Sequence, residues 1–202
     1  MSNNVFSQLP IEDYRKPDKK IEDLFWHRFS PRALSGEALT EEAVLTVLEA
    51  ARFAPSAFNE QPWRFIYSLK DDKAWYETLD CLVEFNQSWA KKSGALLIVL
   101  AKNNFSQNNK VNHTAKFDTG AAWQNLALQA RALGLVAHGM SGFDYEKLKE
   151  KFKISDDFSI IATIALGVPG DIDNLSEDLK KDEKPSGRFK VEKISSRDKF
   201  DF

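Results

Sequence analysis

Residues 40–69 read TEEAVLTVLEAARFAPSAFNEQPWRFIYSL and place a helix, a loop and a strand in immediate succession. Thr40 can cap a helix over 40–53, and two glutamates follow it at the positive end of the helix dipole. Valine, leucine and alanine then recur at helical spacing until Pro55 ends the pattern. An apolar strand is expected over 64–69.

The loop between this helix and strand, residues 54–63, is bracketed by two prolines. Proline fixes the backbone, so Ser56, Asn59 and Gln61 should have defined positions. Asparagine and glutamine each offer a donor and an acceptor, which suits the edge of a ring that carries both. A turn with only local hydrogen bonds is the commoner case for an isolated loop of this kind. Trp63 is expected to pack in the core.

The rest of the chain mixes helical and strand patterns without the regular alternation of a doubly wound fold, which predicts an α+β protein. Helices are expected over 71–83, 84–92, 118–133 and 144–152, and strands over 95–101, 136–140 and 159–167. Gly134 is a natural stop for the third of these helices, and Asp144 can cap the fourth.

Composition favours one cytoplasmic domain over residues 1–202, with 43% hydrophobic and 29% charged residues. The net charge of -2 indicates no nucleic-acid partner. The single cysteine, Cys81, excludes an intrachain disulfide and a Cys-rich zinc site, no metal site is predicted, and a buried thiol is expected. Residues 1–20 lack the apolar core of a signal peptide, and the longest apolar run, 95–101, is too short for a membrane span.

No glycine-rich dinucleotide or P-loop motif is present, so any phosphate must be held by side chains and loops. In the stretch 28–32, Arg28, Ser30 and Arg32 alternate along one side of an extended segment and would suit an anion. Spacing alone favours a solvated edge with its arginines paired to acids. The turn at 139–144 and the segment 186–188 are weak signals taken singly.

Together and in this order, these motifs closely resemble the nitroreductase family of flavoenzymes. That family has an Arg-x-Ser-x-Lys/Arg segment, an Ala-Pro-Ser-x-x-Asn-x-Gln-Pro-Trp loop, an Asp-x-Gly-x-x-x-Gln-Asn-Leu helix, a Gly-Phe-Asp turn and a late Gly-Arg. The matching stretches are 28–32, 54–63, 118–126, 142–144 and 187–188. The resemblance spans about residues 21–194, and the 54–63 motif is its most specific part.

The resemblance implies a mainly antiparallel sheet flanked by helices, in an intertwined homodimer with flavin mononucleotide (FMN) at the interface. Arg28 and Arg188 would bind the phosphate, and Ser30 would hold the phosphate or ribityl end. Arg32 would lie near flavin N1 and O2, Asn59 would read the pyrimidine edge, and backbone N–H groups near Ser141 would reach N5. The full set implied to bind the cofactor is Arg28, Phe29, Ser30, Arg32, Pro55, Ser56, Asn59, Gln61, Met140, Ser141, Gly142 and Arg188.

The implied reaction is a ping-pong transfer in which NADH or NADPH reduces FMN and a nitroaromatic, quinone or similar small acceptor reoxidises it. No acid–base side chain is required. His138 is expected to be a satisfied core residue, and His113 lies in a polar segment that can border the substrate. Reductive dehalogenation, flavin fragmentation, and flavin storage with little turnover stay open as alternatives.

Two departures from the family pattern concern the site. Many relatives carry an acidic residue at the position of Ser141, and many carry lysine at the position of Ser186. The change at Ser141 would alter the redox environment of the flavin. The change at Ser186 would remove one phosphate contact, so that phosphate binding would depend more on Arg28. Residues 1–20 are expected to form an N-terminal extension, and residues 171–202 a C-terminal arm that packs on the partner subunit.

Overall fold

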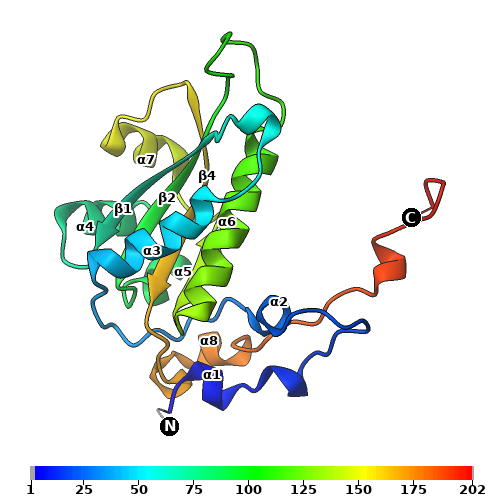
Figure 1. Ribbon diagram of the computed structural model, residues 1–202. Coiled ribbons are helices and arrows are strands. Elements are labelled where there is room, and N and C mark those ends of the chain that lie inside the picture. The colour runs from blue at the N-terminus through cyan, green and yellow to red at the C-terminus, as the bar shows by residue number, and fades with distance from the viewer. Residues whose placement is uncertain (1–2, 202) are drawn as a thin grey trace.

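A four-stranded antiparallel sheet lies at the centre of the computed structural model, which describes residues 3–201 (Figure 1). The strand order is β1-β2-β4-β3, and each neighbouring pair is antiparallel. The α+β prediction with a mainly antiparallel sheet is therefore confirmed. Residues 1, 2 and 202 of the predicted extension and arm lie outside the described residues. The strands are β1 (Trp63–Leu69), β2 (Ala95–Lys102), β3 (Val136–Met140) and β4 (Phe158–Gly167).

Helices cover both faces of the sheet. On one face lie α3 (Glu41–Arg52) and α6 (Ala115–Ala132). On the other lie α4 (Lys73–Asp80), α5 (Glu84–Ala90) and α7 (Tyr145–Phe152). Shorter helices belong to the terminal segments, namely α1 (Val5–Gln8), α2 (Asp23–His27) and α8 (Glu177–Lys181).

The central strand β2 explains why two helical layers form. Leu97 and Val99 point into the core under α3 and α6, whereas Leu96 and Ile98 point into the opposite core. All four side chains are buried, as expected for a strand that is apolar on both faces. The sequence prediction of a buried strand here is confirmed, and the predicted helices at 40–53 and 144–152 form with Thr40 and Asp144 as their caps.

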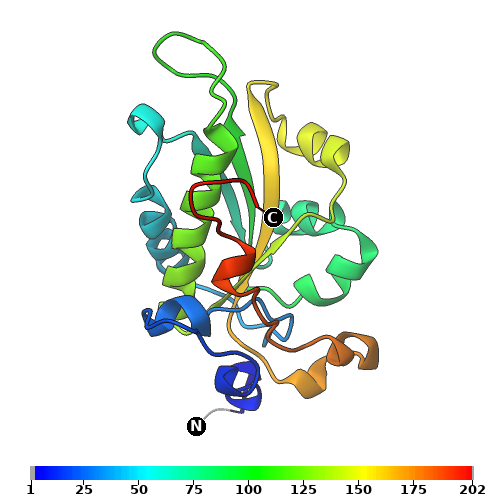
Figure 2. The same cartoon turned by 90° about the vertical axis from the view of Figure 1, so that its right-hand side faces the viewer.

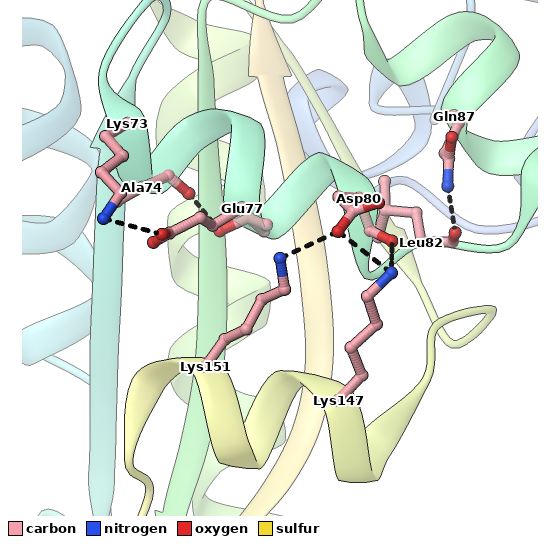
Figure 3. Close-up of polar contacts among 9 residues, drawn as sticks. Lys73, Ala74, Glu77, Asp80, Leu82, Gln87, Lys147 and Lys151 are labelled. Carbon is pink, nitrogen blue, oxygen red and sulfur yellow. Dashed lines mark hydrogen bonds and ion pairs between the residues drawn. The ribbon is translucent and has the colours of Figure 1, made fainter.

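The predicted helix over 71–83 is shorter than expected, because its C-terminal end pairs with the turn after β3. Val83 N donates to Gly142 O at 3.0 Å, and Leu82 forms a β-bridge with Phe143. Lys147 and Lys151 of α7 also reach Asp80 at the end of α4, at 3.0 and 2.8 Å (Figure 3). These contacts fix the 141–143 turn against the α4–α5 junction.

The prediction that α6 begins at Asp118 is also wrong, since the helix begins three residues earlier at Ala115. Asn112 starts it, because its side chain accepts from Thr114 N at 3.1 Å and its carbonyl from Ala115 N at 3.2 Å. The carboxylate of Asp118 instead accepts from Ala57 N, at 3.1 Å. That bond ties the proline-bracketed loop to the first turn of α6.

Parts of both terminal segments pack on the rest of the chain, whereas the last part of the C-terminal segment does not. Val5 and Ile11 are buried with Phe29 and Ala33, so part of the 1–20 segment belongs to the core of its own chain. Residues 171–183 also pack on the same chain, and Leu179 of α8 is buried there. The last part of the chain then extends away from the sheet (Figures 1 and 2).

Two further expectations concern single elements. Cys81 is buried as predicted, and burial raises the pKa of its thiol, which disfavours the reactive thiolate. Within residues 3–201, no helix has the length and apolar character needed to cross a membrane.

Candidate functional site

A cavity of about 370 Å³ opens between the segment after α2, the middle of α6 and the end of β3. Such a volume lies in the range of small-molecule sites. Its polar groups include one guanidinium and two hydroxyls. Its lining consists of Arg28, Ser30, Trp123, Gln124, Gly139, Met140, Ser141 and Ala162.

The extended segment after α2 positions the first two of these side chains. Arg28 Nη1 donates to Ser30 Oγ at 3.1 Å, so the two act together on the cavity side. Phe29 lies between them and is buried instead, with its ring 5.7 Å from Phe6 in an edge-to-face contact. Alternation along the segment therefore separates a cavity face from a core face. A ligand in the cavity would meet Phe29 only through its backbone.

The turn after β3 supplies the opposite wall. Gly142 O accepts from both Val83 N and Asn86 Nδ2, each at 3.0 Å, which fixes the turn. A Cβ at Gly142 would lie 2.7 Å from Asn86 Nδ2 and 2.9 Å from Val83 Cγ2, so any other residue would require these two side chains to shift. The backbone N–H of Gly142 donates no hydrogen bond within the described residues. This donor is therefore free for a ligand.

Three arginines converge beside this cavity from three parts of the chain. Arg15 Nη2 donates to Arg28 O at 2.6 Å, and Arg15 shares a second cavity with Arg188. Burial, and then the charge of Arg188, lower the pKa of Arg28. Among the ion pairs of residues 3–201, none joins any of the three arginines to a carboxylate. The cluster is therefore an uncompensated positive site that suits a phosphate group.

Arg32 lies apart from this cluster. Its Nη1 is 3.7 Å from Oε2 of Glu183, which is only 4% exposed, and its guanidinium lies 5.6 Å from the centre of the Phe85 ring. Glu183 also accepts from Arg32 N at 2.6 Å and from Ala33 N at 2.8 Å. Burial raises the pKa of this carboxyl against the effect of those hydrogen bonds. The residue predicted near flavin N1 and O2 is thus held by an acid from the C-terminal segment.

The proline-bracketed loop stands at the start of α6 and does not line the cavity of Arg28. Phe58, Asn59 and Gln61 all have φ between 51° and 55°, which is costly for residues with a side chain. Ser56 Oγ accepts from Gln61 N at 3.0 Å and holds this conformation. The Asn59 side chain makes no hydrogen bond within the described residues, so its amide is available to a ligand or partner.

One chain thus brings together only part of the predicted set. Arg28, Ser30, Met140 and Ser141 line one cavity, and Arg188 lies beside them. Pro55, Ser56, Asn59 and Gln61 lie at the other end of the α6 face. Sequence reasoning missed Arg15, because it lies in a segment taken as an extension and no periodic pattern or motif surrounds it.

His138 of β3 directly precedes Gly139, which lines the cavity. Its Nδ1 is 3.1 Å from Pro31 O, and its ring lies 4.6 Å from that of Trp89. Burial lowers the pKa of His138 to about 4, with smaller contributions from the charges of Arg32 and Arg28. The ring is therefore neutral at pH 7. Its Nδ1 has a hydrogen-bond partner as predicted, but the side chain is only half-buried, so His138 is not a fully buried core residue.

This depressed pKa predicts a pH-dependent stability. Between pH 6.5 and about 4, His138 is protonated in the unfolded protein but stays neutral in the folded one. The free energy of unfolding therefore falls as pH falls through that window. Urea unfolding from pH 7 to 4 should show a loss of roughly 1–3 kcal/mol that His138→Gln does not show. If the free energy of unfolding fell equally with pH in both proteins, the lowered pKa would not belong to His138.

The fold and the cavity define a class, an antiparallel α+β protein with a cluster of arginines beside a cavity at the turn after a sheet strand. The model of the nitroreductase family matches residues 27–92 and 68–168. The chain belongs to the nitroreductase family.

Three relatives illustrate the relationship. A solved structure described as "the oxidoreductase containing FMN" is 39% identical, covers 93% of this chain and 96% of its own, and has a TM-score of 0.89. A protein of Archaeoglobus fulgidus named "Putative NADH dehydrogenase/NAD(P)H nitroreductase" is 29% identical over 73% of this chain and 84% of its own length. A Desulfovibrio desulfuricans nitroreductase structure in complex with FMN, 23% identical with a TM-score of 0.70, shares the fold and covers 90% of this chain and 100% of its own.

Proposed function

We propose that this protein is an FMN-dependent oxidoreductase that takes electrons from NADH or NADPH and passes them to a small acceptor such as a nitroaromatic or a quinone. The observation that carries the proposal is the uncompensated cluster of Arg15, Arg28 and Arg188 beside a cavity lined by Ser30 and Ser141. The FMN named for the 39% identical structure supports it independently.

The donor set fits FMN in its chemistry. A phosphate needs cationic donors, which Arg28 and Arg188 offer, and a hydroxyl, which Ser30 offers. A ring nitrogen that gains electron density needs a backbone donor, which Gly142 offers. When bound, FMN would supply the hydride-accepting and hydride-donating chemistry.

The chain's own residues have three tasks in this proposal. Arg28 and Arg188 bind the phosphate, and Arg32 provides a fixed positive charge whose position is set by Glu183. Gly142 presents its N–H from a turn that cannot shift, because Val83 and Asn86 hold its carbonyl. Preorganised donors of this kind need no rearrangement as charge develops.

The Asn59 loop is proposed to complete the site of a partner subunit. The loop is held rigidly by Asp118 at the start of α6, yet Asn59 itself is exposed and unpaired within the described residues. Exposed Phe58 and Phe117 flank it, which indicates a surface that another chain covers. A homodimer with two composite sites would place each loop at its partner's FMN, with the arm beyond residue 184 packed on that partner.

A ping-pong course follows from a single cavity that donor and acceptor occupy in turn. No side chain that lines the cavity is an acid or a histidine, so the residues there position and exclude water rather than transfer protons. The cavity wall formed by the turn after β3 carries no charge at position 141, because this chain has Ser141 where many relatives have an acidic residue.

The visible spectrum of the purified protein tests the first claim. Two flavin absorption bands are expected, either at once or after incubation with FMN. Their absence in both samples would contradict FMN binding.

Anaerobic turnover tests the second claim. NADH or NADPH should bleach the bands, and a nitroaromatic or quinone should restore them. A flavin that stays oxidised with both donors would identify a storage protein, whereas loss of halide from a halogenated aromatic or breakdown of the flavin itself would identify another reaction of the fold.

A further inference from the structure

Arg15 joins three separate segments of the chain through one guanidinium. Its Nε donates to Trp26 O at 3.0 Å, its Nη2 to Arg28 O at 2.6 Å and its Nη1 to Ser186 O at 3.0 Å. The rigid fork of arginine makes such a three-way contact possible, and lysine has no equivalent geometry. The backbones that carry Arg28 and Arg188 are thereby fixed relative to each other.

This arrangement has an electrostatic cost, because no carboxylate among the described residues pairs with Arg15, Arg28 or Arg188. Burial lowers the pKa of Arg15 to about 10, and the charges of Arg188 and Arg28 add to that effect. Arg15 and Arg28 are half-buried and Arg188 is exposed, and the three have only carbonyl and hydroxyl partners, so their positive charges favour an anion between them.

We propose that Arg15 is a positioning residue that holds Arg28 and the Ser186–Arg188 segment around one phosphate group. Phosphate binding and docking of residues 186–193 are then coupled. The proposal rests on the proposed function only in naming the phosphate as that of FMN. The site itself takes a phosphomonoester or inorganic phosphate.

Coupling follows from the signs of the charges. Without an anion, Arg188 approaches two other cations, and the exposed segment that carries it is held to the body there by the Arg15–Ser186 bond. With a dianion present, each arginine is attracted to the same centre. By reciprocity, whatever loosens the segment must weaken phosphate binding by the same factor.

The first experiment compares FMN with riboflavin, which lacks the phosphate. Apo-protein is titrated with each flavin for wild type, Arg15→Met, Arg15→Lys and Arg131→Met. Arg131 is a matched control, since it is half-buried and lies 4.0 Å from the Phe6 ring but does not join the cluster. Arg15→Met should weaken FMN binding about ten-fold or more and riboflavin binding little, as for the loss of charge-assisted contacts. Arg15→Lys should recover only part of the loss, and Arg131→Met should leave the FMN-to-riboflavin ratio unchanged.

A change of the same factor for both flavins would show that Arg15 only stabilises the fold, and would overturn the proposal. Full recovery by lysine would show that charge suffices and that the three-carbonyl geometry is irrelevant.

The second experiment needs no flavin. Amide hydrogen exchange over residues 187–193 is measured with and without inorganic phosphate. Phosphate should slow exchange in wild type and in Arg131→Met but not in Arg15→Met. No protection of the wild type would overturn the coupling, whether or not the protein binds FMN. Protection by phosphate in a protein that binds no flavin would leave this inference standing while the proposed function fails.

Discussion

Replacing Arg28 by methionine is expected to weaken FMN binding about 100-fold, because a charge-assisted phosphate contact contributes about 1.5–3 kcal/mol. Among the described residues, Arg28 is the only cation that lines the 370 Å³ cavity, and its guanidinium already shares a hydrogen bond with Ser30. Methionine keeps an unbranched stem, so the packing against the cavity wall is largely preserved. Equilibrium titration of the apo-protein with FMN measures the effect.

The specificity of this loss is its main check. Riboflavin affinity should change less than about three-fold, because the change removes a phosphate contact alone. Raised ionic strength should weaken FMN binding more in wild type than in Arg28→Met, since screening acts on the charge that the variant lacks. An FMN affinity close to that of wild type would refute the phosphate role of Arg28.

Replacing Gly170 by alanine should destabilise the protein by about 3 kcal/mol. The added Cβ would lie 2.4 Å from Leu34 C, 2.6 Å from Leu34 O and 2.7 Å from Ser35 N. These are backbone atoms and cannot rotate away. Gly170 N also donates to Ala33 O at 2.9 Å, and Gly170 O accepts from Val5 N at 2.8 Å. The substitution therefore separates three segments that meet at one point.

Gly187→Ala is the matched control, because a Cβ there would meet nothing within 4 Å. Urea unfolding should give a lower midpoint for Gly170→Ala and an unchanged one for Gly187→Ala. Because the Gly170 contact holds the backbone just after Arg32, FMN binding should also weaken in the first variant. Equal urea midpoints for the two variants would show that residues 33–35 can shift to make room for the added Cβ and would contradict the prediction.

The local elements of this protein follow closely from its sequence. Thr40 and Asp144 were both predicted correctly as helix caps, from the helical spacing that follows each of them. The predicted bounds of strand β3, 136–140, were correct at both ends. Errors arose where a tertiary contact took over a residue with a clear local preference. Asp118 is a good helix cap by type, yet its carboxylate holds Ala57, and the helix begins at Ala115.

The candidate site shows the same division. The family resemblance implied one cofactor site that contains Arg28, Ser30, Met140 and Ser141, and these four line one cavity. Phe29 was included with its neighbours, although the alternation of an extended segment turns its ring into the core. No feature of the sequence indicated that Glu183 would hold Arg32, since 151 positions separate the two.

The sequence pattern by itself therefore determined the α+β class and the caps, because these depend on spacing and residue type over short distances. The family resemblance added the antiparallel sheet and the residues implied to bind the cofactor. Tertiary structure alone decided that Arg15 joins Arg28 and the segment of Arg188. Arg15 and Ser186 are 171 positions apart, and only the tertiary fold brings Arg15 Nη1 within 3.0 Å of Ser186 O. Charges that repel one another are brought together there by backbone carbonyls, and local sequence preference carries no record of such an arrangement.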